Sequence, residues 1–161
     1  MSDGRERLDR LVIARGWAKS RPRAERLITE FGIRVDGLVL HKPGKRVPTD
    51  AVLEPLGEDM PWVSRGAYKL LAALEAWPEI QLRDRIVLDV GSSTGGFTQV
   101  CLERGARGVC AVDTGRDQLD PELRGDSRIA LHEQTNVLDL PPSAVEQAFG
   151  ALADLAVVDA S

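Results

Sequence analysis

One stretch near the middle of the chain, IVLDVGSSTGGFTQVCLERG, restricts the fold more than any other. An apolar run ends in Asp89 and passes directly through Gly91, Gly95 and Gly96 into a helical segment. Glycines allow a tight turn and a close approach of the backbone to a ligand, and the helix that follows offers unpaired N–H groups at its start. This order is typical of a turn that binds a nucleotide or a nucleoside in an α/β fold.

The pattern after residue 63 predicts a parallel sheet. Four short apolar runs, IVLDV, GVCAVD, RIALHE and LAVVDA, are separated by polar or helical stretches, as expected of β-α units. A helix is expected before the first run and is stopped by Pro78, because apolar residues recur there at helical spacing. These residues are Ala67, Leu70, Leu71, Leu74 and Trp77.

The first 50 residues predict a smaller α+β unit of two helices and a hairpin. One amphipathic helix ends at Gly16, and a second begins at the N-cap Ser20 and ends near Gly32. The Asp36-Gly37 dipeptide inside IRVDGLVL is a strong hairpin signal. Further turns are expected at Lys42-Pro43-Gly44 and at Val47-Pro48. Because 55–63 combines prolines, a glycine and acids without periodicity, we place domains at 1–58 and 64–161 and a linker at 59–63.

Charge is divided unevenly between the two parts. Residues 1–50 hold 12 Lys and Arg against 7 Asp and Glu, whereas residues 51–161 hold 9 against 18. A basic module beside an acidic domain suits a polyanion such as RNA, although a basic segment is also compatible with a solvated surface. The candidates for phosphate contacts cluster around the second helix and the hairpin. They are Lys19, Arg21, Arg23, Arg26 and Arg34.

The acid that precedes the glycine turn indicates the kind of ligand. The spacing matches neither a P-loop nor the G-x-G-x-x-G fingerprint, which disfavours an NAD-type oxidoreductase. An Asp next to the turn fits poorly with a pyrophosphate but well with a ligand that carries an ammonium group, such as S-adenosylmethionine. Asp113 at the end of the second strand is placed to bind a ribose, and Asn136 to donate to and accept from an adenine edge. The full set of candidate cofactor contacts is Asp89, Gly91, Ser93, Gly95, Gly96, Phe97, Asp113 and Asn136.

The chain resembles the hemolysin A (TlyA-like) family. The resemblance rests on a basic helix-helix-hairpin unit followed by ordered motifs: WVSRGAYKL (62–70), DVGSSTGGFT (89–98), Asp113, TN (135–136) and VVDAS (157–161). This family joins an RNA-binding domain of the ribosomal protein S-four type to an FtsJ/RrmJ-like methyltransferase domain. The resemblance therefore implies a Rossmann-like class I methyltransferase fold for the second part.

The resemblance also implies an activity, the 2′-O-methylation of cytidine ribose in ribosomal RNA with S-adenosylmethionine as cofactor. The family's active site is a Lys-Asp-Lys-Glu set, of which Lys69 and Asp159 match the first two members. The other two would lie beyond residue 161, so we expect an incomplete methyltransferase domain that is inactive as this fragment. Arg65 is a further candidate for a contact with RNA phosphate.

The resemblance and the composition also indicate the partners and the cellular location to expect for this protein. Ribosomal RNA or ribosomal subunits are the expected partners, and the absence of a long apolar run or secretory signal predicts a cytoplasmic protein without membrane contact. Cys101 and Cys110 lack metal or redox spacing and are expected to be buried thiols. The alternative function is an RNA-binding module with a catalytically silent methyltransferase half. The sequence indicates no oligomeric state.

The charge pattern makes a first testable prediction. The isolated segment 1–58 should bind structured RNA, with an affinity that falls steeply as salt increases. Replacing Arg21, Arg23 and Arg26 together by alanine should weaken binding and flatten the salt dependence, because fewer counterions are released. Titration of a labelled RNA at several salt concentrations measures both effects, and unchanged affinity and slope would contradict the prediction.

Overall fold

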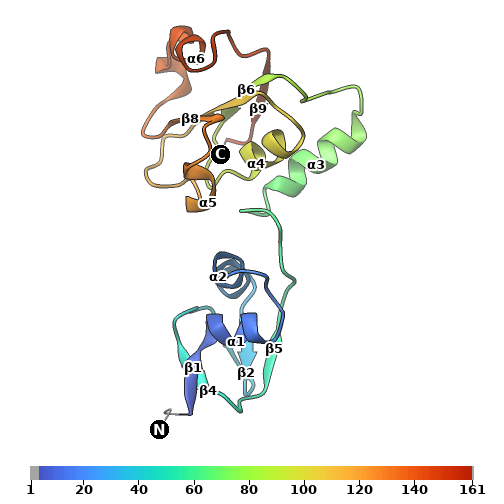
Figure 1. Ribbon diagram of the computed structural model, residues 1–161, viewed down its shortest axis with the longest axis vertical. Helices are drawn as coiled ribbons and strands as arrows, with labels where there is room; N and C mark the ends of the chain where they lie inside the picture. The colour runs from blue at the N-terminus through green and yellow to red at the C-terminus, as the bar shows by residue number, and fades with distance from the viewer. Residues whose placement is uncertain (1–3, 161) are drawn as a thin grey trace. The chain divides into compact units, whose positions relative to one another are not determined.

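The computed structural model describes residues 4–160 (Figure 1). Contacts divide the chain into two units, Met1–Pro61 and Trp62–Ser161. Each unit has a hydrophobic core of its own. The boundary lies inside the predicted linker at 59–63, whose limits stay a prediction.

The first unit contains the two helices and the hairpin that the sequence predicts. Its elements are β1 (Arg5–Arg7), α1 (Leu8–Ala14), α2 (Arg21–Glu30), β2 (Ile33–Val35), β3 (Leu38–Leu40), β4 (Arg46–Pro48) and β5 (Leu53–Pro55). The Ser20 hydroxyl accepts a hydrogen bond from the Arg23 N–H at 3.4 Å, as expected of an N-cap. Antiparallel pairing of β2 with β3 around Asp36 and Gly37 confirms the hairpin.

The prediction of a turn at Val47 and Pro48 is wrong. Both residues belong to β4, which pairs antiparallel with β1, and β5 pairs with β2 on the side away from β3. Strands of three residues are too short to show an alternating pattern, and the partners of β4 lie about 40 positions away in the chain. Only the tertiary fold reveals this pairing.

The second unit is an α/β domain with a parallel sheet, as predicted. Its elements are α3 (Ala67–Ala76), β6 (Ile86–Val90), α4 (Gly96–Glu103), β7 (Gly108–Val112), α5 (Pro121–Arg124), β8 (Ile129–His132), the 3₁₀ turn η1 (Val137–Asp139), α6 (Pro142–Phe149) and β9 (Leu155–Val158). The strand order is β8-β7-β6-β9, and every pairing is parallel.

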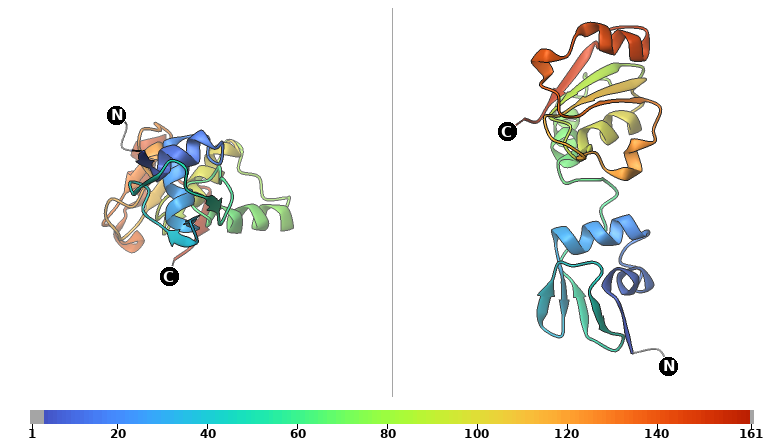
Figure 2. Two further views of the ribbon diagram at one scale, coloured as in Figure 1. Left: turned by 90° about the horizontal axis from the view of Figure 1, so that it is seen from below. Right: turned by 90° about the vertical axis from the view of Figure 1, so that its left-hand side faces the viewer.

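Helices cover both faces of this sheet (Figures 1 and 2). Val87 and Val109 pack with residues of α3 and α4, whereas their neighbours Ile86 and Cys110 pack with Val145 of α6. This alternation follows from the two-residue repeat of a strand, which sends successive side chains to opposite faces. Both faces are therefore apolar, which explains why the strands read as continuous hydrophobic runs.

The strand order creates a switch point beside β6. The chain runs outward from β6 through β7 to β8 and then returns to place β9 on the other side of β6. Val90 is paired with Val112 of β7 and with Val158 of β9. Gly91, Asp113 and Asp159 therefore leave the sheet side by side at its carboxyl edge, where open α/β sheets bind their ligands.

Two further expectations concern the thiols and the membrane. Cys101 and Cys110 are free and buried, as predicted. Burial raises the pKa of the Cys101 thiol to about 12 and that of Cys110 to about 11, so both stay protonated. Between residues 4 and 160, no helix has the length and apolar character required to cross a membrane.

Candidate functional site

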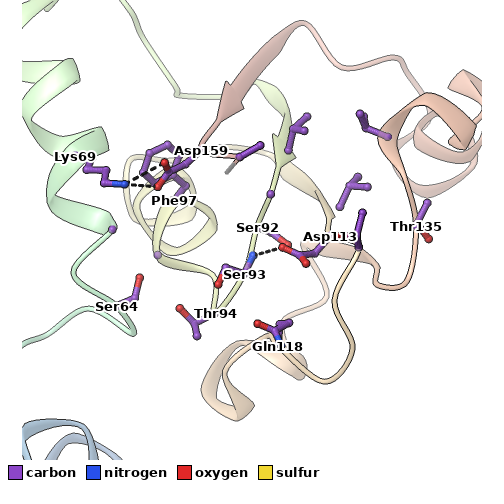
Figure 3. Close-up of a pocket in the computed structure, with 18 of the residues that line it drawn as sticks. Ser64, Lys69, Ser92, Ser93, Thr94, Phe97, Asp113, Gln118, Thr135 and Asp159 are labelled. Atoms are coloured by element: carbon purple, nitrogen blue, oxygen red, sulfur yellow. Dashed lines mark hydrogen bonds and ion pairs between the residues drawn. The ribbon is translucent and has the colours of Figure 1, made fainter. Parts of the chain in front are cut away.

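A cavity of about 700 Å³ opens at the carboxyl edge of the sheet (Figure 3). Its walls come from the start of α3, the glycine turn, and the segments that follow β7, β8 and β9. The lining residues are Ser64, Gly66, Lys69, Val90, Gly91, Ser92, Ser93, Thr94, Gly96, Phe97, Val112, Asp113, Thr114, Gln118, Thr135, Asn136, Val137, Asp159 and Ala160. Lys69 and Asp159 of the predicted catalytic set and six of the eight predicted cofactor contacts are among them.

The glycine turn packs too tightly to accept a side chain at its first position. Gly91 has φ of +78°, and a Cβ placed there would lie 2.8 Å from the carbonyl oxygen of Asp159. Both the left-handed conformation and this close approach require glycine. The turn thus touches the segment after β9 on one side and leaves its other side open to the cavity.

Asp113 fastens the glycine turn to the loop after β7. Its Oδ2 accepts a hydrogen bond from the Ser93 N–H at 2.8 Å (Figure 3). Its Oδ1 accepts one from the Gly115 N–H at 2.7 Å. The carboxylate also lines the cavity. It can therefore organise the turn and accept hydrogen bonds from a ligand, since each oxygen has two acceptor sites.

Asn136 is positioned by its own backbone. Its Oδ1 accepts a hydrogen bond from the Leu138 N–H at 3.0 Å and caps η1. One acceptor site of the amide is therefore in use, which leaves the amide N–H groups as the simpler contact for a ligand. The predicted contact with an adenine edge stays a prediction.

Lys69 and Asp159 form an ion pair at one end of the cavity. The Lys69 Nζ lies 3.0 Å from Oδ1 and 2.9 Å from Oδ2 of Asp159, although the residues are 90 positions apart (Figure 3). The side chains are 66% and 40% exposed, so solvent screens the pair and its contribution to stability is small. The consequence of this pair is that the Lys69 ammonium group lies at the cavity.

Asp89 lies behind the glycine turn and does not line the cavity. It is fully buried on the α3 and α4 side of the sheet, where its Oδ2 accepts a hydrogen bond from the Thr98 hydroxyl at 2.6 Å. Its Oδ1 and the Ser92 hydroxyl have no hydrogen-bond partner among the described residues. Burial raises the Asp89 pKa to about 6, and the nearby Asp113 and Asp159 add to the shift.

The structure adds several residues that the sequence did not single out. Ser64 reaches the start of α4, because a Cβ on Gly96 would lie 2.4 Å from its hydroxyl oxygen. Thr94 and Thr135 belong to the sequence motifs 89–98 and 135–136, so their position next to predicted site residues could have identified them. Gln118 lies in an irregular loop, and no pattern in the sequence distinguishes it from a solvated residue. Besides Asp89, two further predicted residues of this unit, Gly95 and Arg65, are not lining residues.

In the first unit, three of the predicted RNA-binding arginines are engaged by acids. Arg21 pairs with Glu25 at 3.0 Å and lies 3.6 Å from the buried Asp9. Arg23 pairs with Asp59 at 2.7 Å, and Arg34 pairs with Glu54. RNA phosphates would have to compete with these carboxylates, so the excess of basic residues overstates the positive charge that is freely available.

The fold defines a Rossmann-like domain with a cavity at the carboxyl edge of its parallel sheet. Residues 62–161 match the family described as FtsJ-like methyltransferase, and residues 6–53 match the S4 domain. The chain therefore belongs to the FtsJ-like methyltransferase family.

Individual relatives confirm the resemblance to the TlyA-like family. A Mycobacterium tuberculosis (strain H37Rv) protein named 16S/23S rRNA (cytidine-2'-O)-methyltransferase TlyA is 44% identical over 98% of this chain and 57% of its own length. Hemolysin A of Brachyspira hyodysenteriae is 36% identical over 83% of this chain and 55% of its own length. A solved structure of a hemolysin-named protein from Streptococcus thermophilus has a TM-score of 0.61 and 35% identity, with 98% of this chain and 57% of that chain covered. The chain thus spans little more than half the length of these relatives.

The buried carboxylate makes a prediction about stability and pH. Because the pKa of Asp89 is raised to about 6 in the folded state, its protonated form favours folding below about pH 4, and this contribution is lost as the pH rises through 6. Asp89→Asn has no charge to bury and keeps an oxygen for the Thr98 hydroxyl. The free energy of unfolding of Asp89→Asn relative to the unmodified protein should rise by up to about 3 kcal/mol between pH 4 and pH 8. Urea unfolding of both proteins at the two pH values measures this change, and a difference independent of pH would contradict it.

Proposed function

We propose that this protein is an S-adenosylmethionine-dependent methyltransferase that acts on the ribose 2′-hydroxyl of ribosomal RNA. The observation that carries the proposal is the arrangement of the cavity. Asp113 lies at one end, the Lys69–Asp159 pair lies at the other, and the glycine turn runs between them (Figure 3). A single cavity can therefore hold a nucleoside at one end and present an ammonium group at the other.

The residues present fit this cofactor. Carboxylates at Asp89, Asp113 and Asp159 surround the turn and favour a positively charged ligand over a pyrophosphate. Asp113 would accept hydrogen bonds from the ribose hydroxyls, and Gln118 and Asn136 also line the cavity. When bound, S-adenosylmethionine would supply an electrophilic methyl group on a sulfonium sulfur.

Lys69 and Asp159 suit the activation of a weakly acidic hydroxyl. An ammonium group beside a ribose hydroxyl lowers the pKa of that hydroxyl and stabilises the alkoxide as it forms. Asp159 contacts the ammonium through both carboxylate oxygens and so fixes its position. A positioned hydroxyl is the main requirement of an in-line methyl transfer, which needs no nucleophile from the protein.

The first unit supports RNA as the substrate. It matches the S4 domain and carries the basic part of the chain. The relative in Mycobacterium tuberculosis is named for cytidine 2′-O-methylation in 16S and 23S rRNA. Cytidine ribose in ribosomal RNA or ribosomal subunits is therefore the proposed substrate, and the cytoplasm is the proposed location.

Replacement of Asp113 tests the cofactor assignment. Asp113→Ala in the full-length protein should weaken S-adenosylmethionine binding by about 1–3 kcal/mol, or roughly ten- to a hundredfold. The loss combines direct hydrogen bonds to the ribose with the bonds that hold Ser93 and Gly115. Calorimetry measures it, with Asp139→Ala as a control because this exposed acid is not a lining residue. Equal affinity of Asp113→Ala and the unmodified protein would refute the assignment.

Replacement of Lys69 tests the chemical step. Lys69→Ala in the full-length protein should lower methyl transfer to ribosomal RNA by about a hundredfold or more, as expected when a group that stabilises developing charge is removed. S-adenosylmethionine affinity should change little, because the ammonium is assigned to the reacting hydroxyl. Radiolabelled methyl transfer and cofactor calorimetry separate the two effects. Near-normal turnover would remove Lys69 from the mechanism, and RNA binding without transfer by the unmodified full-length protein would favour a silent RNA-binding module.

A further inference from the structure

Glu133, the residue directly after β8, binds three consecutive backbone N–H groups of the loop after β7. Its Oε2 accepts from Asp117 at 2.8 Å, and its Oε1 accepts from Gln118 at 2.8 Å and from Leu119 at 3.0 Å. Arg124 donates to the same Oε1 at 3.1 Å. Only 13% of the Glu133 side chain is exposed. One carboxylate therefore fixes the backbone conformation of this loop.

The loop that Glu133 holds is one wall of the cavity. Thr114 and Gln118 line the cavity, whereas Glu133 itself does not. Two further hydrogen bonds join the segments after β7 and β8, from the Gln134 N–H to the Gly115 oxygen at 2.8 Å and from the Thr135 N–H to the Asp113 oxygen at 3.0 Å. The segments after β7 and β8 thus form one connected network beside Asp113.

The same loop also packs against the glycine turn. Leu119 is 2% exposed, and a Cβ on Gly95 would lie 2.7 Å from a methyl carbon of Leu119. The Asp120 N–H also donates to the Thr94 oxygen at 3.0 Å. A shift of the loop would therefore move the glycine turn as well as the wall that carries Gln118.

The electrostatics of Glu133 agree with this arrangement. The Leu119 N–H does most to lower the pKa of the Glu133 carboxyl, and the Gln118 and Asp117 N–H groups act in the same direction. The carboxylate is consequently ionised at neutral pH, and hydrogen bonds to an ionised acceptor are shorter and stronger than neutral ones. A neutral side chain of equal size would hold the loop less firmly.

We propose that Glu133 is a positioning residue for cofactor binding, which holds the loop at 114–120 in the conformation that receives the nucleoside end of the cofactor. This inference rests on the proposed function. Glu133 belongs to the Asp113 end of the cavity, and the Lys69–Asp159 pair lies at the other end. Loss of Glu133 should therefore affect the binding of cofactor and leave the chemical step nearly intact.

The experiment compares cofactor binding with turnover in the full-length protein. Glu133→Gln keeps the size of the side chain but removes the charge and one of the two acceptor oxygens. We expect its dissociation constant and KM for S-adenosylmethionine to rise about tenfold, which corresponds to about 1.4 kcal/mol. The kcat at saturating cofactor should stay within about twofold, because the ammonium group that acts in the transition state is untouched. Adenosine alone should show the same loss of affinity, because the loop contacts only that end.

Two matched variants separate loop positioning from the loss of an ion pair. Asp126→Asn removes a carboxylate that contacts Arg128 at 2.7 Å, outside the cavity, and should leave binding unchanged. Arg124→Gln removes the cation that contacts Glu133, together with its hydrogen bond to the Leu119 oxygen, and preserves the three N–H contacts. Its effect should therefore be smaller than that of Glu133→Gln. If Glu133→Gln does not fold, Glu133→Asp replaces it, since it keeps the charge and shortens the reach.

The outcomes distinguish this inference from the proposed function. Failure of the unmodified full-length protein to bind S-adenosylmethionine would refute the proposed function. Normal binding by the unmodified protein together with equal binding by the Glu133 variant would overturn the role of Glu133 alone. A fall in kcat without a rise in KM would also overturn it, because positioning of the nucleoside end predicts the opposite pattern.

Discussion

The site depends on the parallel register of three strands. Val90 of β6 is paired with Val112 of β7 and Val158 of β9, so the chain leaves all three strands at the same level. The Gly91 N–H donates to the Val112 oxygen at 2.9 Å and the Asp159 N–H to the Val90 oxygen at 3.1 Å, which extends the ladder into the site. A slip of one residue would turn Asp113 and Asp159 to the other face of the sheet and disperse the cavity.

The two ends of the cavity carry different kinds of charge. Asp113 is held by the N–H groups of Ser93 and Gly115 and can act only as an acceptor when ionised. Lys69 contributes an ammonium group that Asp159 holds but does not bury. The Asp113 end is thus fixed by backbone hydrogen bonds, whereas the other end keeps an exposed cation that Asp159 holds in place. Under the proposed function, this division separates binding of the cofactor from activation of the substrate.

In the first unit, an excess of basic residues does not by itself mean that their positive charge is available to RNA. Arg21, Arg23 and Arg34 are paired with acids of the same unit. Arg21 and Arg34 are the more exposed of the three, and such exposed pairs contribute only about 0–1 kcal/mol to stability, so a phosphate can replace the carboxylate at low cost. Arg23 is less exposed and is bound to Asp59, so it is harder to release. The arginines near the second helix are therefore unequal candidates.

The sequence by itself determined the features that arise from local sterics and periodicity. The Ser20 cap, the Asp36-Gly37 hairpin, the buried strands and the glycine turn each depend on residues a few positions apart, and the strand ends already pointed to Asp113 and Asp159. The tertiary structure alone decided the β1–β4 pairing, the burial of Asp89 behind the turn and the hold of Glu133 on the loop after β7. It also decided that Lys69 contacts Asp159, which the resemblance implied only as membership of one site. These features join segments that are distant in the chain, and the choice among many distant partners is made by the packing of the whole domain.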